Sequence, residues 1–130
     1  MKYDNGQEIP SFTAMDNKLF EKIYKMTELT DRQKDVLLSL CRQILYQDEN
    51  NVIRTSWWGA VYVTADDVGC SPKTVQRAYK RFEELNIISK KPRLREKNID
   101  GKEVPRNVNW ITINTDTDTW RTKPCPETEL

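Results

Sequence analysis

The fold is decided by the stretch Gly69-Cys70-Ser71-Pro72-Lys73-Thr74-Val75-Gln76-Arg77-Ala78-Tyr79-Lys80-Arg81-Phe82-Glu83-Glu84-Leu85. Gly69 permits a sharp turn, because a residue without a Cβ adopts a positive φ at no steric cost. Ser71 can cap a helix, since its hydroxyl accepts a hydrogen bond from a backbone N–H of the first turn. Pro72 then falls at the first helical position, where a missing N–H costs nothing. The stretch therefore predicts a turn followed by a helix over 72–85.

The predicted helix has two different faces. Apolar residues recur at helical spacing and form one stripe, which consists of Val75, Ala78, Tyr79, Phe82 and Leu85. The opposite face is polar and mostly basic, and it carries Lys73, Thr74, Gln76, Arg77, Lys80 and Arg81. One face suits a protein core, and the other suits a polyanion and the edges of bases.

A second helix is predicted upstream, over 31–46. Thr30 and Gln33 form a capping box, in which each side chain can satisfy the backbone N–H of the other residue. Its apolar stripe consists of Val36, Leu37, Leu40, Cys41, Ile44 and Leu45. A shorter helix, capped by Asp16, is predicted before it. The apolar side of that helix would carry Leu19, Phe20, Ile23 and Tyr24.

Residues 52–63 fit two structures. Their β-branched and aromatic side chains favour a strand. The end of the segment also belongs to a helical pattern leading to Gly69, with one face formed by Val61, Thr64, Ala65 and Val68. The adjacent Trp57 and Trp58 are typical of core or edge packing, although Trp is also enriched at the centres of protein interfaces.

A β-hairpin is predicted downstream, over 87–113. Residues 87–91 are typical of a strand, and residues 107–113 alternate with period two. One face of the second strand would carry Val108, Trp110 and Thr112, and the other would carry Ile111 and Ile113. Between the strands, Asp100-Gly101 is a hairpin-turn signal. Together with the aromatic residues of the preceding helix, Trp110 is interpreted as a core residue.

At 130 residues the chain suits one domain with two tails. Residues 1–15 are polar and are interpreted as a flexible N-terminal segment. The domain is expected to span residues 16–113. Residues 114–130 contain Pro124 and Pro126 and lack periodicity, so they are interpreted as a flexible C-terminal tail.

The charge of the chain is unevenly distributed. The net charge is +1, yet residues 71–106 hold 11 Lys and Arg against 5 Asp and Glu, a net charge of +6. Residues 1–70 carry −3 and residues 107–130 carry −2. A region of one sign on a nearly neutral protein is the electrostatic footprint of a phosphate-binding face.

The composition argues against several classes of function. Histidine is absent, which removes the commonest general base and any Ser–His or Cys–His nucleophile pair. Cys41, Cys70 and Cys125 include no CxxC pair, so no zinc site is predicted, and their odd number fits a reducing compartment. No apolar run approaches the roughly 20 residues of a membrane span, and the first residues do not resemble a signal peptide. We therefore expect a cytoplasmic protein with no metal, no cofactor, no enzymatic activity and no membrane partner.

The order helix, helix, turn, helix and hairpin is that of a winged helix-turn-helix. Ala65-Asp66-Asp67-Val68-Gly69-Cys70-Ser71-Pro72-Lys73-Thr74-Val75-Gln76-Arg77, running on to Phe82-Glu83-Glu84-Leu85-Asn86-Ile87-Ile88, resembles the signature of bacterial winged-helix proteins, many of which belong to phages and plasmids. Leu29-Thr30-Asp31-Arg32-Gln33-Lys34 is similar to a helix start in the N-terminal domains of replication initiators and phage replisome organisers. The resemblance covers roughly residues 16–113.

This resemblance implies an α+β fold, a winged helix-turn-helix with a three-helix core, a β-hairpin wing and an extra short N-terminal helix. In such families the helix before the turn has about two turns and begins near residue 60, which favours a helix over 60–68. A strand over 60–63 would instead shorten that helix to 64–68.

The predicted DNA-binding residues follow from this arrangement. Helix 72–85 would enter the major groove, and the wing over 87–113 would contact phosphates. Arg77 could form a forked contact with guanine, and Gln76 could contact adenine or a phosphate. The helix and its cap contribute Ser71, Lys73, Thr74, Gln76, Arg77, Lys80 and Arg81. The wing contributes Lys90, Lys91, Arg93, Arg95, Lys97, Lys102 and Arg106.

Double-stranded DNA is therefore the expected partner, in transcription regulation or replication initiation, and the resemblance points to a mobile element. The sequence leaves a homodimer open. The alternative is a winged helix used as a protein–protein interaction module, with Trp57, Trp58 or the C-terminal tail as the contact.

Overall fold

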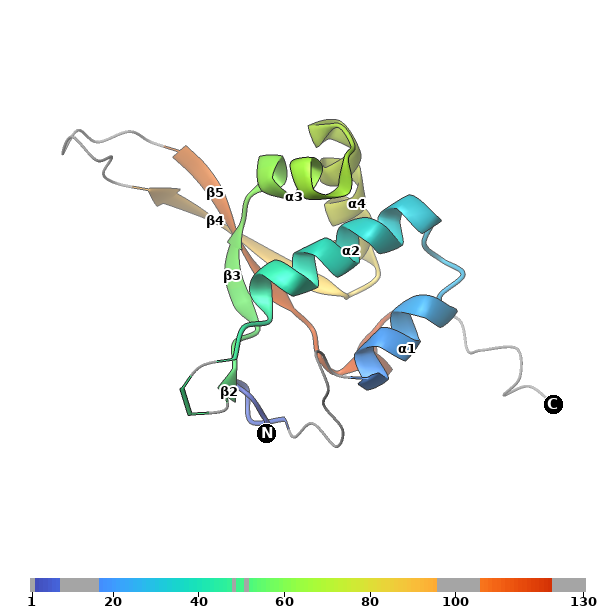
Figure 1. Cartoon of the computed structure of the whole chain (residues 1–130), viewed down its shortest axis with the longest axis vertical. Coiled ribbons are helices and arrows are strands. Elements are labelled where there is room, and N and C mark those ends of the chain that lie inside the picture. Colours follow the sequence, from blue (N-terminus) through green and yellow to red (C-terminus); the bar gives the residue numbers. More distant parts are fainter. Residues whose placement is uncertain (1, 8–16, 48, 51, 96–105, 123–130) are drawn as a thin grey trace.

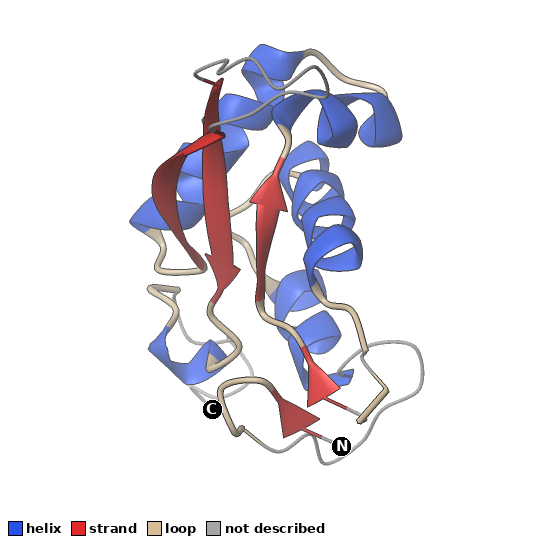
Figure 2. Ribbon diagram, turned by 90° about the vertical axis from the view of Figure 1, so that its left-hand side faces the viewer, coloured by secondary structure: helices blue, strands red, loops and turns tan. Residues whose placement is uncertain are grey.

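The computed structural model describes residues 2–7, 17–47, 49–50, 52–95 and 106–122. Within these residues the fold is α+β, with helices packed against one side of a small antiparallel sheet (Figures 1 and 2). The elements are β1 (Lys2–Tyr3), α1 (Asn17–Lys25), α2 (Asp31–Ile44), β2 (Val52–Ile53), β3 (Ser56–Gly59), α3 (Val61–Val68), α4 (Pro72–Glu84), β4 (Ile88–Arg95), β5 (Arg106–Ile113) and a 3₁₀ turn (Thr117–Thr119). This order confirms the winged-helix prediction.

Helix α2 begins at the predicted capping box. The Thr30 hydroxyl accepts from the Gln33 backbone N–H at 3.1 Å, and the Gln33 side chain accepts from the Thr30 backbone N–H at 2.9 Å. The apolar stripe is buried within α2, whereas Leu45, just after the end of the helix, is half-buried. Burial raises the pKa of the Cys41 thiol to about 12. Cys41 is therefore a core residue, as predicted, and its thiol stays protonated and unreactive.

Helix α3 resolves the two alternatives for the segment before Gly69. Residues 61–68 are helical, although Val61 and Val63 individually prefer strand. The longer helix is favoured because it adds Val61 to the face that Thr64 and Ala65 turn toward the core. A strand over 60–63 would break this helical spacing. Gly69 ends α3 with a φ of +79°, a left-handed conformation that favours glycine.

The core lies between α1, α2, α4 and the inner face of the sheet. Its central side chains are Leu19, Ile23, Val36, Leu37, Leu40, Val75, Phe82, Ile111 and Ile113. The predicted apolar stripe of α4 is confirmed throughout. In α1 the prediction was wrong for Tyr24, which is 67% exposed, because the helix turns only Leu19 and Ile23 fully inward.

The wing is part of a three-stranded sheet with the order β3-β5-β4. β4 and β5 pair in continuous register from Ile88 opposite Ile113 to Arg95 opposite Arg106. β3 pairs with the other side of β5. Residues 52–63, which fitted either a strand or a helix, therefore contain the strand β3 and the first turn of α3. The predicted turn at Asp100-Gly101 lies outside the described residues.

Two predictions about the outward face and the tails need correction. Trp110 is half-buried on the sheet rather than in the core, because β5 turns Ile111 and Ile113 toward the helices instead. Residues 114–122 are not a loose tail, because Trp120 is 5% exposed and belongs to the core.

The first residues are not loose either. Tyr3 is buried against Ile53, and β1 pairs in parallel with β2. The boundaries predicted at residues 15 and 113 therefore exclude parts of the chain that pack on the domain. Residues 8–16 and 123–130 lie outside the described part. None of the described helices has the length and apolar character needed to cross a membrane.

Candidate nucleic-acid interface

The start of α4 is fixed by Ser71. Its hydroxyl accepts from the Thr74 backbone N–H at 3.2 Å and lies 3.0 Å from the Thr74 hydroxyl, and Pro72 occupies the first turn. The role predicted first for Ser71, a helix cap, is confirmed. Both hydroxyls are engaged with each other, so their first effect is to hold the N-terminal turn of α4 in place.

The outward side of α4 is a polar stripe of four exposed residues at positions i, i+3, i+4 and i+7. The stripe consists of Lys73, Gln76, Arg77 and Lys80. The first turn of α4 contains no acidic residue. In the described part of the chain, none of the three cations of this stripe forms an ion pair. The α4 stripe therefore presents positive charge and hydrogen-bond donors to solvent.

Two other predicted contact residues are already paired with carboxylates. The Lys90 ammonium lies 2.8 Å from a Glu83 carboxylate oxygen, and an Arg81 guanidinium nitrogen lies 3.4 Å from Glu84. Sequence reasoning placed both cations on the binding face but missed these partners, because a helix face alone does not show which side chains meet. Both pairs are partly exposed to solvent and worth about 0–1 kcal/mol, so a phosphate can compete for either cation.

The wing continues the basic region beyond α4. Lys91 is exposed, and the backbone of Arg93, Arg95 and Arg106 belongs to the paired strands β4 and β5, which extend past β3 in Figure 1. Arg95 lies opposite Arg106 in the register. The predicted contact residues Lys97 and Lys102 fall outside the described residues.

A chain of polar side chains connects α4 to α2 and α3. The buried hydroxyls of Tyr79 and Thr64 are hydrogen-bonded to each other at 2.8 Å. The Gln43 amide donates to Thr64 at 3.0 Å and to Ser39 at 3.1 Å. Ser39 in turn donates to Asp67 at 2.6 Å. Burial, more than any other influence, raises the pKa of Tyr79, so its hydroxyl remains protonated in this chain.

This polar chain fixes α4 relative to the platform formed by α2 and α3. Sequence reasoning did not find it. Thr64 was assigned to an apolar face, and nothing in the spacing of these residues shows that three helices bring them together. Because a satisfied buried network specifies one arrangement of its elements, the direction in which the α4 stripe faces is set by these contacts.

We expect the Asp67 carboxyl to titrate below the ordinary aspartate value. The Ser39 hydrogen bond, followed by that from Arg42, lowers its pKa. A folded-state pKa below the unfolded one stabilises the fold at pH values above the unfolded pKa, and this contribution is lost as the pH falls through the folded value. An NMR titration of the Asp67 carboxyl carbon measures it. Ser39→Ala should move the pKa upward, and no movement would contradict the assigned cause.

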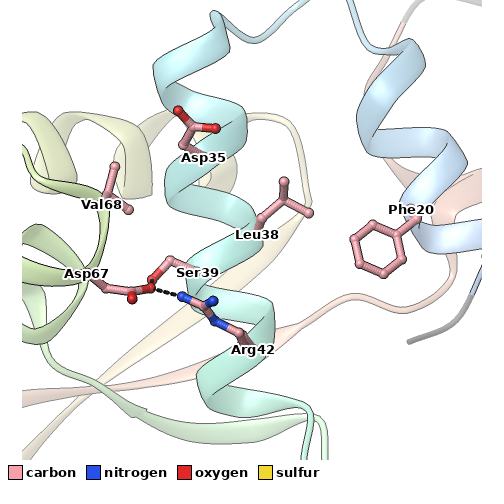
Figure 3. A pocket seen from close by; sticks show the side chains of 7 residues that line it. All are labelled: Phe20, Asp35, Leu38, Ser39, Arg42, Asp67 and Val68. Atoms are coloured by element: carbon pink, nitrogen blue, oxygen red, sulfur yellow. Dashed lines mark hydrogen bonds and ion pairs between the residues drawn. The ribbon is translucent and has the colours of Figure 1, made fainter. Parts of the chain in front are cut away.

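An open cleft of about 400 Å³ lies beside this network (Figure 3). It is lined by Phe20, Asp35, Leu38, Ser39, Arg42, Asp67 and Val68. Arg42 forms an ion pair with Asp67 within the cleft, so these two charges already compensate each other. Phe20 on α1 and Leu38 on α2 supply its apolar side, and we assign no ligand to it. In the part of the chain described, no cluster of residues could hold a metal ion.

The sequence matches no protein-family model and no curated protein. Two solved structures are similar to this chain in fold. A possible transcriptional regulator from Methanosarcina mazei Go1 has 19% identity and a TM-score of 0.48, over 85% of this chain and 78% of that one. The N-terminal domain of a DNA binding protein has 14% identity and a TM-score of 0.40, over 83% of this chain and 85% of that one. Similarities this low assign no function to the chain.

Proposed function

We propose that this chain is a sequence-specific double-stranded DNA-binding protein that places α4 in the major groove. The observation that carries the proposal is the α4 stripe, whose three cations are exposed and, among the described residues, unpaired. The major groove of B-DNA, about 12 Å wide, admits an α-helix. The opposite side of α4 is fully committed to the core, so only this stripe can face a ligand.

Each residue of the stripe has a role that its chemistry suits. Arg77 can donate two hydrogen bonds to guanine O6 and N7, which is worth about 1–3 kcal/mol of discrimination between bases. Gln76 can form the corresponding contact with adenine. Lys73 and Lys80, at the two ends of the stripe, suit the flanking phosphates. Specificity then comes from the middle of the stripe and affinity from its ends.

The wing supplies the phosphate contacts that carry no sequence information. Lys91 is exposed, and the wing contributes further cations along β4 and β5. Each phosphate contact steepens the dependence of log affinity on log salt concentration by about 0.9. Lys90 and Arg81 join these contacts only by leaving their carboxylate partners, so we propose them as secondary contacts.

We propose a role in transcription regulation or replication initiation of a phage or plasmid, within the cytoplasm. The support for this role is the resemblance of residues 65–88 and of the α2 start to such proteins. Selection of bound DNA from a random pool distinguishes the modes of binding. A palindromic site with half-sites about 34 Å apart would indicate a homodimer, and a single asymmetric site would indicate a monomer.

The test of the proposal is the double variant Lys73→Ala/Arg77→Ala. We expect its affinity for the selected duplex to fall about 10- to 100-fold, because one base contact and one phosphate contact are lost. The log–log salt slope should become shallower by about 0.9, the contribution of the one lost phosphate contact. Fluorescence anisotropy of labelled duplex at several salt concentrations measures both.

The matched control is Lys22→Ala/Lys25→Ala, which removes the same charge from α1. It should change the affinity less than about threefold, because screening limits the reach of distant charges. If the α4 variant keeps the affinity and the salt slope of the unmodified protein, α4 does not contact DNA and the proposal is wrong.

A further inference from the structure

Three tryptophans gather on the sheet where β3 meets β5. Trp58 lies opposite Trp110 in the register, and their rings meet edge to face, with centroids 4.8 Å apart at 84°. The Trp57 ring lies 6.2 Å from that of Trp110. Trp57 is 40% exposed, and the other two are half-buried. These residues form what we call the tryptophan cluster.

Trp58 and Trp110 belong to the face of the sheet that turns away from the core, whereas Trp57, on the edge strand β3, lies opposite the buried Ile111. Ile111 and Ile113 of β5 are buried toward the helices, whereas Trp110 and Thr112 alternate with them and remain partly exposed. In Figure 2 the helices lie behind and beside the strands, which leaves the opposite face of the sheet in front. The rings of Trp58 and Trp110 are therefore partly exposed on this face, and that of Trp57 is exposed on the edge strand β3, at a place that the α4 stripe does not use.

Cations flank the cluster. The Arg54 guanidinium lies 3.6 Å from the centroid of the Trp57 ring and is held by hydrogen bonds to the backbone oxygens of Ile44, at 2.8 Å, and Gln43, at 2.9 Å. These bonds fix the guanidinium at the C-terminal end of α2. On the other side, the exposed Lys91 lies opposite Trp110 in the register.

The other described side chains of this face are small and polar. The hydroxyls of Ser56 and Thr112 are hydrogen-bonded to each other across the strands at 2.7 Å, and Ser89 lies opposite Thr112. No carboxylate belongs to these positions of β3, β4 and β5 in the described residues. A protein interface would require further apolar side chains for its desolvated centre, and the side chains described on this face, apart from the indoles, are serine, threonine and lysine.

We propose that the tryptophan cluster binds single-stranded DNA, with unpaired bases stacked on the indole rings and phosphates near Arg54 and Lys91. Every base presents a π-face, so stacking on aromatic side chains between cations is the chemistry by which single strands are bound without sequence preference. The site shares Lys91 with the wing but uses no residue of α4, so it does not depend on the function proposed for α4.

The test uses the full chain and a labelled oligothymidylate of about 12 nucleotides, which forms no duplex. We expect binding by anisotropy, together with quenching of tryptophan fluorescence. Trp57→Leu should weaken this binding about 10-fold, and Trp57→Phe, which keeps an aromatic ring, should weaken it less than about threefold. Trp57 is the most exposed ring of the cluster, so these variants are the least damaging to the fold. Lys91 is shared with the wing and is left unchanged.

Two comparisons separate this proposal from the function of α4. Trp57→Leu should retain its affinity for the selected duplex, and Lys73→Ala/Arg77→Ala should retain its affinity for the oligothymidylate. Loss of oligothymidylate binding in the α4 variant would place the single strand on α4 and overturn the proposal.

Other outcomes also overturn it. Equal binding of oligouridylate, with the same dependence on Trp57, would make the site a general single-strand site rather than a DNA site. Absence of oligothymidylate binding, or binding that is indifferent to Trp57→Leu, would remove single-stranded DNA as the ligand. If oligothymidylate does not bind, a protein partner whose binding depends on Trp57 would identify the cluster as a protein-docking surface.

Discussion

Replacing Trp120 with alanine is expected to lower the free energy of unfolding by about 3–5 kcal/mol, the usual cost of truncating a large buried aromatic residue. Trp120 is 5% exposed and packs into the main core cluster. Its indole N–H donates to the backbone oxygen of Asn114 at 2.7 Å, and the next residue, Arg121, donates from its backbone to Leu85 at 2.7 Å. Urea denaturation followed by far-UV circular dichroism measures the loss.

The control is Trp120→Phe, which keeps most of the buried surface and loses the indole hydrogen bond. It should cost about 1 kcal/mol, within the usual worth of one hydrogen bond. A Trp120→Ala loss within about 0.5 kcal/mol, the range of surface substitutions, would mean that residues 114–122 do not stabilise the domain.

Tyr79→Ala is expected to be equally costly, at about 3–5 kcal/mol of unfolding free energy. The substitution empties a buried site between α3 and α4 and also leaves the Thr64 hydroxyl without its 2.8 Å partner. Tyr79→Phe isolates the second effect and should cost about 0.5–1.5 kcal/mol, because the Thr64 hydroxyl loses one hydrogen bond and keeps the one from Gln43. Equilibrium unfolding of both variants gives the two values.

A double-mutant cycle tests whether the hydrogen bond is responsible. Thr64→Val alone leaves the Tyr79 hydroxyl without its hydrogen-bond partner. Thr64→Val combined with Tyr79→Phe removes both hydroxyls and should cost less than the sum of the two single changes. Strict additivity would show that the polar chain does not couple α3 to α4. The cycle also bears on the α4 stripe, because the same contacts set the direction that the stripe faces.

Local signals in the sequence were sufficient for α2 and α4. The cap at Ser71, the capping box at Thr30 and the apolar spacing within α2 and α4 act over a few residues, so the start and the buried face of each helix could be predicted. The exposed side of α4 followed from the same spacing. The predicted stripe of α4 and its exposed cations therefore agree with the structure.

Contacts between distant residues were beyond local patterns. β3 becomes a strand by pairing with β5, about fifty residues later, and the tryptophan cluster exists only because that pairing places Trp58 opposite Trp110. Trp120 stands alone in a polar stretch without periodicity, so nothing local marks it as buried. The partners of Lys90 and Arg81 depend likewise on which carboxylates the packed helix brings near.

Pro92 limits the pairing of the exposed edge of β4 with a strand of another molecule. β4 is one of the two edge strands of the order β3-β5-β4, and Pro92 lies opposite Asn109. The Asn114 backbone N–H donates to the Ile87 oxygen at 2.8 Å, so alternate residues of β4 bond to β5, and the nitrogen of Pro92 points to the open edge. An incoming strand of another molecule meets a position without an N–H there. The wing can thus expose a long strand without serving as a template for aggregation.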